Sequence, residues 1–60
     1  MNKDIAEGKV KQVKGKMKEE IGKATGDESM EIEGQTEHLT GHIQEEYGKI
    51  KQSVKKAIEL

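Results

Sequence analysis

The chain has 60 residues, of which 30% are hydrophobic and 38% are charged, and its net charge is -1. A chain this short buries only about 60% of the surface that its unfolded form exposes, and it has no cysteine for a stabilising disulfide. It also lacks the roughly 18 consecutive apolar residues of a membrane span and the apolar run of a secretory signal. The composition therefore predicts one marginally stable soluble domain, residues 1–60, located in the cytoplasm.

Residues 5–24 carry apolar side chains at the three- and four-residue spacing of an amphipathic helix. Asp4 followed by Glu7 resembles a capping box at its start. Glycines recur every seven residues on the opposite side of this helix, about 160° from the apolar stripe at about 100° per residue. The apolar stripe consists of Ala6, Val10, Val13, Met17, Ile21 and Ala24.

A turn is expected at about residues 25–29. Gly26 is a suitable helix stop, and Asp27 or Ser29 is a suitable N-cap for a second helix.

Residues 31–50 repeat the first unit with a shift of 26. Gly8, Gly15 and Gly22 fall on Gly34, Gly41 and Gly48, and both copies contain the pattern E-E-[IY]-G-K. Two copies suit a pair of similar helical units related by a pseudo-twofold axis, each covering the apolar stripe of the other. The residues expected to form this core are Val13, Met17, Ile21, Leu39, Ile43, Tyr47 and Ile50.

The six repeated glycines allow two interpretations, because each glycine in an exposed helix costs about 1 kcal/mol relative to alanine. They mark helix ends and a second close backbone contact, or they keep the helices weak so that order depends on a partner. If Gly22 and Gly48 are C-terminal caps, the chain forms four short helices; otherwise it forms two long ones. The predicted fold class is all-α, a small helical bundle of two similar units, with two orthogonally packed hairpins as one form of it.

The segments "MNKDIAEGKVKQVKGKMKEEIGKATGD" and "IEGQTEHLTGHIQEEYGKIK" resemble the CsbD-like family of small bacterial general stress-response proteins, over about residues 2–51. The resemblance implies a bacterial, mostly cytoplasmic protein with a small all-helical orthogonal bundle. It implies no enzymatic activity and supplies no active site to carry over.

Catalytic and metal-binding patterns are weak in this sequence. His38 and His42 are four residues apart and Glu45 follows three residues later, but no fourth metal ligand is evident. The hydroxyl residues have no positioned base, and a chain this small offers little pocket to shift a carboxyl pKa. We therefore expect no enzyme, no catalytic, cofactor-binding or metal-binding residues, no cofactor and no small-molecule substrate.

Charge is distributed unevenly along the chain. Residues 1–25 hold seven lysines and four acids, residues 26–46 hold seven acids and no lysine, and residues 47–60 hold four lysines and one acid. The absence of arginine and of stacking aromatics in the first segment argues against nucleic-acid binding. A protein partner, or peripheral contact with an anionic membrane, remains open. The sequence thus predicts a non-enzymatic protective or partner-binding module, with association with an anionic membrane surface or nucleic acid under stress as the alternative.

Overall fold

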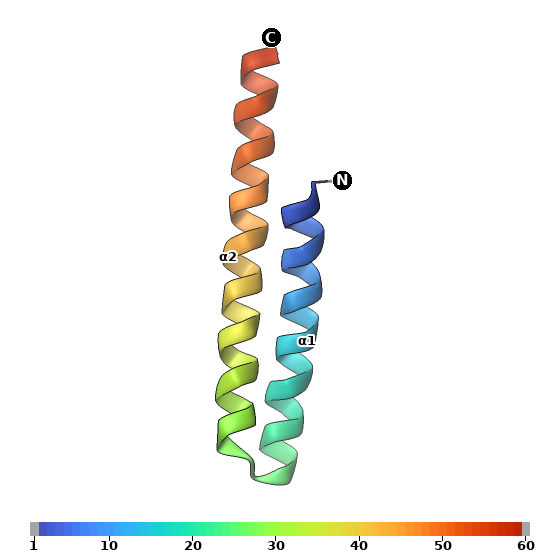
Figure 1. The fold of residues 1–60 in the computed structure, drawn as a ribbon, viewed down its shortest axis with the longest axis vertical. Helices are drawn as coiled ribbons and strands as arrows, with labels where there is room; N and C mark the ends of the chain where they lie inside the picture. Colours follow the sequence, from blue (N-terminus) through green and yellow to red (C-terminus); the bar gives the residue numbers. More distant parts are fainter. Residues whose placement is uncertain (1, 60) are drawn as a thin grey trace.

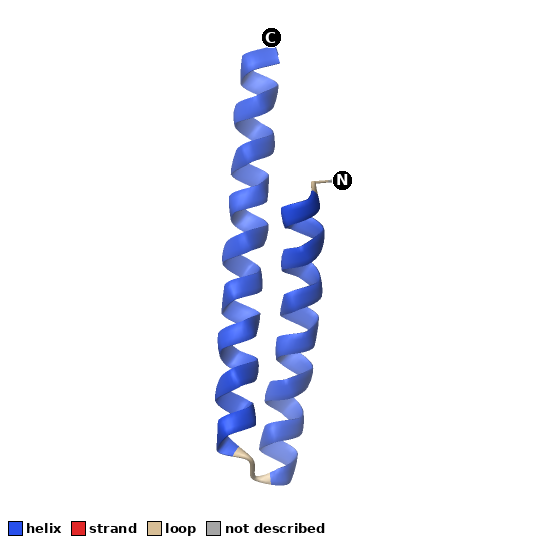
Figure 2. Cartoon of the chain, viewed as in Figure 1, coloured by secondary structure: helices blue, strands red, loops and turns tan. Residues whose placement is uncertain are grey.

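The computed structural model describes residues 2–59, with side chains to residue 58, and it shows a single antiparallel helical hairpin (Figure 1). Helix α1 spans Lys3–Thr25 and helix α2 spans Glu28–Glu59. The described residues contain no strand (Figure 2). Helix α2 is the longer helix, and its C-terminal turns extend past the start of α1. The molecule is a narrow rod measuring 52 × 14 × 10 Å.

Two capping side chains and one glycine fix the helix ends. The Asn2 side chain accepts a hydrogen bond of 2.7 Å from the Asp4 backbone N–H, so Asn2 is the N-cap of α1. The expected capping box starting at Asp4 is therefore wrong, and Asp4 lies inside the first turn. Gly26 ends α1 with a left-handed φ of 74°, a conformation that glycine adopts without strain. Asp27 accepts a hydrogen bond of 3.0 Å from the Met30 N–H at the start of α2.

Glycines form the contact between the two helices. A Cβ atom placed on Gly8 would lie 2.5 Å from the Gly41 carbonyl oxygen, and one placed on Gly41 would lie 2.5 Å from the Gly8 oxygen. Gly15 and Gly34 face each other in the same reciprocal way. The obstructing atoms are mostly backbone atoms, which cannot move aside as a flexible side chain does. We call this contact the glycine seam; it consists of Gly8, Gly15, Gly22, Gly34, Gly41 and Gly48.

The register of the glycine seam reflects the internal repeat. The residue numbers of the facing glycines add to 49 in both pairs, and the shift of 26 exchanges one pair for the other. The shift of 26 also relates polar contacts between the helices. It carries the ion pair of Lys18 with Glu37 onto the hydrogen bond of Gln44 with Lys11. The hairpin thus has the local pseudo-twofold symmetry that the sequence repeat predicts.

The apolar stripes do not form the core, so that expectation is wrong. The predicted core residues Val13, Met17, Ile21, Leu39, Ile43, Tyr47 and Ile50 are all exposed. Among the described residues, Ile5 is the one buried hydrophobic side chain, at 8% exposure. The reason is geometric: when backbones meet at glycines, no space for large side chains is left between the helices. Each stripe therefore faces outward, about 160° from the seam.

The remaining alternatives about the fold are resolved by the helix bounds. Both helices continue through their glycines at positions 22 and 48, so the chain forms two long helices and not four short ones. The all-helical architecture is confirmed. Two orthogonal hairpins are not, because the described chain forms only one hairpin with its helices side by side (Figure 1).

Candidate functional site

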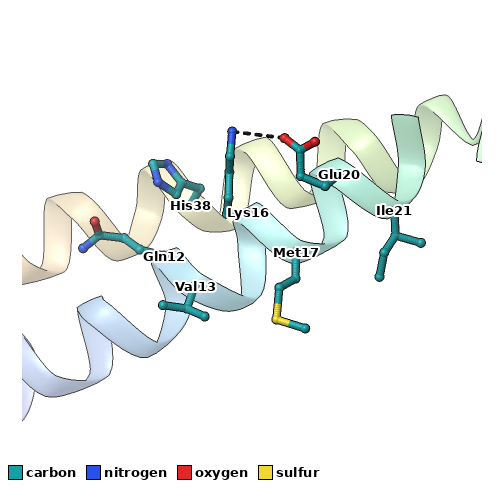
Figure 3. Close-up of a pocket in the computed structure, with 7 residues that line it drawn as sticks. All are labelled: Gln12, Val13, Lys16, Met17, Glu20, Ile21 and His38. Atoms are coloured by element: carbon teal, nitrogen blue, oxygen red, sulfur yellow. Dashed lines mark ion pairs between the residues drawn. The ribbon is translucent and has the colours of Figure 1, made fainter. Parts of the chain in front are cut away.

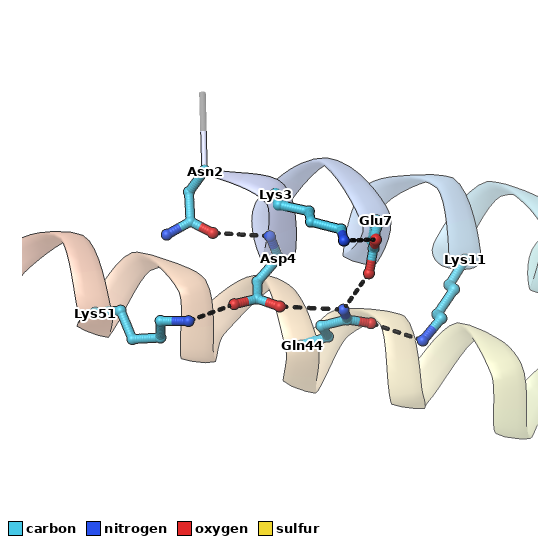
Figure 4. Close-up of polar contacts among 7 residues, drawn as sticks. All are labelled: Asn2, Lys3, Asp4, Glu7, Lys11, Gln44 and Lys51. Atoms are coloured by element: carbon cyan, nitrogen blue, oxygen red, sulfur yellow. Dashed lines mark hydrogen bonds and ion pairs between the residues drawn. The ribbon is translucent and has the colours of Figure 1, made fainter.

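The polar faces of the hairpin are occupied by contacts between its own side chains. Near the start of α1, the Gln44 amide donates to Glu7 Oε2 at 2.9 Å and accepts from Lys11 Nζ at 2.7 Å (Figure 4). Lys51 Nζ lies 2.8 Å from Asp4 Oδ2. The hydrogen bond from Lys51, together with that from Gln44, holds the Asp4 pKa below its ordinary value. These groups connect α1 to α2 and are not free for chemistry.

Glu45 is the most enclosed acid of the described chain, at 8% exposure. Its carboxylate accepts a hydrogen bond of 2.6 Å from Gln12 and lies within 4 Å of the ammonium groups of Lys9 and Lys49. The Gln12 hydrogen bond is the largest cause of a lowered Glu45 pKa, which outweighs the opposing effect of burial. A general acid needs a raised pKa, so Glu45 is suited to cross-linking the helices and not to proton transfer.

The three residues whose spacing raised the question of a metal site lie apart in their contacts. His38 and His42 are exposed on α2, while Glu45 is bound to Gln12. Within residues 2–58, no group of three histidine, aspartate or glutamate side chains is placed to hold a metal ion.

The candidate functional surface is instead the outer side of α1, which we call the α1 edge: Val10, Val13, Met17 and Ile21. Figure 3 shows the side chains of Val13, Met17 and Ile21 pointing away from α2. They line a shallow apolar depression whose polar border includes Lys16 and Glu20, an ion pair of 3.2 Å. All four residues of the α1 edge are exposed by 46% or more.

Lysines border this edge on both sides. At about 100° per residue, Lys9 and Lys16 fall on one flank of the stripe, and Lys14 falls on the other. Lys14 makes no ion pair with any described residue, whereas Lys9 and Lys16 contact acids of the hairpin. The α1 edge therefore combines apolar contact area with a charged border, in which Lys14 is a lysine without an ion pair to a described residue.

The outer side of α2 carries a second and longer stripe, the α2 edge: Ile32, Leu39, Ile43, Tyr47, Ile50, Val54 and Ile58. Near its C-terminal end Lys51 Nζ lies 5.2 Å from the centre of the Tyr47 ring, a cation–π geometry. A shallow depression there is lined by Ile50, Lys51, Val54, Lys55 and Ile58. The charges of α2 also change along its length, from acids before Tyr47 to mostly lysines after it.

Sequence reasoning identified the stripe residues but assigned them to the interior. The signal it missed is the glycine register: two seven-residue glycine series whose members pair when the chain folds back on itself. Such close backbone approach at small residues is known from helix pairs in membranes. Large residues are then displaced to the outer sides, where they are available for binding.

Comparison with known proteins places this chain among small bacterial proteins. A family model described as CsbD-like matches residues 4–56. The chain is 52% identical over 58 residues to the UPF0337 protein YjbJ of Salmonella typhimurium strain LT2, covering 97% of this chain and 83% of that protein. It is 50% identical to YjbJ of Escherichia coli K12, with 97% and 84% covered, and 44% identical to the UPF0337 protein mll8179 of Mesorhizobium japonicum, with 95% and 92% covered.

No solved structure matches this chain significantly. Within the described residues, neither helix has a segment apolar enough and long enough to cross a membrane.

Proposed function

The chain belongs to the CsbD-like family, and on that premise we propose that it is a non-enzymatic stress-response protein that binds apolar segments of partner proteins. The observation that carries the proposal is the outward placement of the large apolar side chains. Eleven of them are exposed by 46–79%, although the hairpin holds only one buried hydrophobic residue among those described. The names of the relatives given above state no enzymatic activity.

The α1 edge is the surface best suited to such a partner. Val10, Val13 and Ile21 are β-branched and stiff, whereas Met17 is unbranched and adapts to partners of different shape. The lysines on both flanks favour a segment that is itself bordered by acidic residues, since complementary charge guides association. The expected partner is thus a protein that exposes an apolar segment with acidic neighbours, as partly unfolded proteins do during stress. We propose that this binding takes place in the cytoplasm.

A binding role is also more compatible with the polar groups than catalysis is. The carboxylates of Asp4, Glu19, Glu37 and Glu45 accept hydrogen bonds that lower their pKa values. An acid that remains ionised and bonded to the other helix keeps the hairpin together. It does not donate a proton at neutral pH.

The test is aggregation of an acidic model protein during heating, followed by light scattering with and without this chain. We expect the wild-type chain to delay aggregation and the variant Val13→Gln/Met17→Gln to lose most of that effect. Thr40→Gln on α2, a change at an exposed polar position, is the matched control and is expected to behave as wild type. Circular dichroism verifies that all three chains are equally helical.

Two results would contradict the proposal. Equal protection by the wild type and by Val13→Gln/Met17→Gln would show that the α1 edge does not bind. If the wild type gives no protection even at several times the molar amount of the model protein, the chain does not bind partly unfolded proteins of this kind.

The lysine border supports a second candidate, which is peripheral binding of anionic lipid through the same edge. Co-sedimentation with vesicles containing phosphatidylglycerol distinguishes the two candidates. Binding that requires the anionic lipid, is lost in Val13→Gln/Met17→Gln and disappears at high salt would favour the membrane. Protection of the model protein without vesicle binding favours the protein partner.

A further inference from the structure

The α2 edge has a symmetric arrangement about its centre. Counted outward from Ile43, Leu39 and Tyr47 are four residues away, Thr36 and Ile50 are seven, and Ile32 and Val54 are eleven. All seven positions fall within about 80° of one another on the helix at about 100° per residue. Six of these seven positions are apolar, the exception being Thr36 opposite Ile50, and Ile58 lies outside this symmetry. Residues 32–54 of the stripe are thus largely complementary to an antiparallel copy of themselves.

We propose that the α2 edge is the interface of a homodimer in which α2 pairs antiparallel with α2 of a second copy, with Ile43 at the twofold axis. Residue numbers that face each other across this interface add to 86. Ile32 then meets Val54 of the partner subunit, and Leu39 meets Tyr47 of the partner subunit. Residues 32–54 give a seam of about 33 Å at 1.5 Å per residue. Such a self-complementary contact closes at two copies.

The charge along α2 favours this direction of pairing. Apart from Glu59 at its end, the acids of α2 lie before Tyr47 and its lysines lie after it, so antiparallel copies place acidic turns beside basic turns. Glu33 and Lys51 lie on the same flank of the stripe, and in this register each faces the other across the interface with an offset of about 3 Å along the axis. Glu33 makes no ion pair with any described residue of its own chain, whereas Lys51 already lies 2.8 Å from Asp4 Oδ2, so in the dimer the Lys51 ammonium is shared between Asp4 and Glu33 of the partner subunit.

Other self-contacts are less suitable. A contact between two α1 edges brings the lysine borders together, including the unpaired Lys14 of each copy. A parallel pair of α2 helices places acids against acids. A contact between the α1 edge of one copy and the α2 edge of the next joins unlike surfaces, so it leads to rings or chains of molecules and not to a twofold dimer.

The length difference between the helices supports the same interface. The last turns of α2 extend beyond α1 (Figure 1), and Ile50, Val54 and Ile58 are exposed by 53–79%. In the antiparallel dimer these turns lie along residues 28–36 of the partner subunit. The part of α2 that extends beyond α1 thus packs against α2 of the partner subunit.

This inference does not depend on the proposed function. The two α1 edges remain on the outer sides of the dimer, so partner binding can fail while the dimer persists, and the reverse also holds. The experiments on the two edges are therefore separate.

Sedimentation equilibrium of the full chain from about 10 to 500 µM tests the association. We expect a monomer–dimer equilibrium for the wild type. Ile43→Lys places two lysines at the axis and is expected to weaken dimerisation at least tenfold. Met17→Lys makes the same change on the α1 edge and is expected to retain the dimer. Circular dichroism establishes that both variants remain helical.

Cysteine cross-linking tests the register, because the chain contains no cysteine of its own. Ile43→Cys is expected to form an intermolecular disulfide readily under mild oxidation, since residue 43 meets its own copy. Ile32→Cys alone is expected to cross-link poorly, and the double variant Ile32→Cys/Val54→Cys is expected to cross-link well. Val10→Cys on the α1 edge is the control.

Several outcomes would overturn the proposal. A wild-type chain that stays monomeric at 500 µM has no such interface. Assemblies larger than two indicate the open contact between unlike edges. Preferential cross-linking through Val10→Cys, or an unchanged dimer in Ile43→Lys, would place the contact elsewhere.

Discussion

Adding a methyl group at Gly15 tests whether glycines hold the hairpin closed. The new Cβ would lie 2.6 Å from the Gly34 carbonyl oxygen and would also collide with the backbone nitrogen of His38. Ordinary contact begins at 3.4 Å, so clearing the Gly34 oxygen alone requires the helices to separate by roughly 0.8 Å, and clearing the nearer His38 nitrogen requires more. Overpacking of this kind typically costs about 1–3 kcal/mol. The gain in helix propensity from glycine to alanine is about 1 kcal/mol. The expected net loss in the free energy of unfolding is about 1 kcal/mol.

For a domain of this size, about 1 kcal/mol lowers the melting temperature by roughly 4–8 °C. Thermal unfolding of Gly15→Ala is followed by circular dichroism, with Ser53→Ala as the control. Ser53 lies in the exposed C-terminal part of α2, so its replacement raises helix propensity without a collision and is expected to raise the melting temperature slightly. All chains are compared at one protein concentration, because dimerisation also shifts the melting temperature.

Helicity alone does not report whether the hairpin is closed. Spin labels at Lys14 and Thr40, two exposed positions without polar contacts among the described residues, therefore measure the separation of α1 and α2. We expect the separation to increase or to become broadly distributed in Gly15→Ala. A higher melting temperature together with an unchanged separation would refute the seam and would support the other interpretation, that glycines merely weaken the helices.

Two further predictions concern acid and the turn between the helices. Acid should open the hairpin. Hydrogen bonds from Gln12 and Gln35 hold the pKa values of Glu45 and Glu19, respectively, below their ordinary 4.5. The stability that these ionised carboxylates contribute is present above pH 4.5 and is lost as the pH falls through the lowered pKa values. The separation of spin labels at positions 14 and 40, followed from pH 7 to 2, measures this, and opening already at pH 6 would contradict it. Asp27→Ala removes the acceptor of the Met30 N–H and should cost about 1 kcal/mol in thermal unfolding; Ser29→Ala is the control, and equal losses in the two variants would argue against the cap.

The local structure could be predicted from the sequence because it depends on neighbouring residues. Helical spacing, the stop at Gly26 and the repeat that relates Gly8 to Gly34 are all patterns within one chain segment, and each appears in the structure. The direction in which the stripes face could not be predicted in the same way. It depends on which helix surfaces meet, and residues such as Met17 and Ile43 were assigned to the core because burial of large apolar side chains usually determines that choice.

The candidate surface was missed for the same reason. Two competing patterns have helical spacing in this chain, one apolar and one of glycine, and either can form the contact between helices. Close backbone approach excludes side chains between the helices, so choosing the glycine pattern necessarily moves residues such as Val13 outward. The pairing of Gly8 with Gly41 and of Gly15 with Gly34 shows that the glycine pattern forms the contact. This pairing is found only when the second half of the sequence is read backwards against the first, as in an antiparallel hairpin.

The near absence of a buried apolar interior has a consequence for the behaviour of this hairpin with temperature. Unfolding usually raises the heat capacity by about 12–15 cal/mol/K per residue, because apolar surface becomes hydrated. Here most large apolar side chains are already hydrated in the folded hairpin, so that increase should be small. A small increase removes most of the curvature from the dependence of stability on temperature, so the rod should become steadily more stable on cooling and should escape cold denaturation.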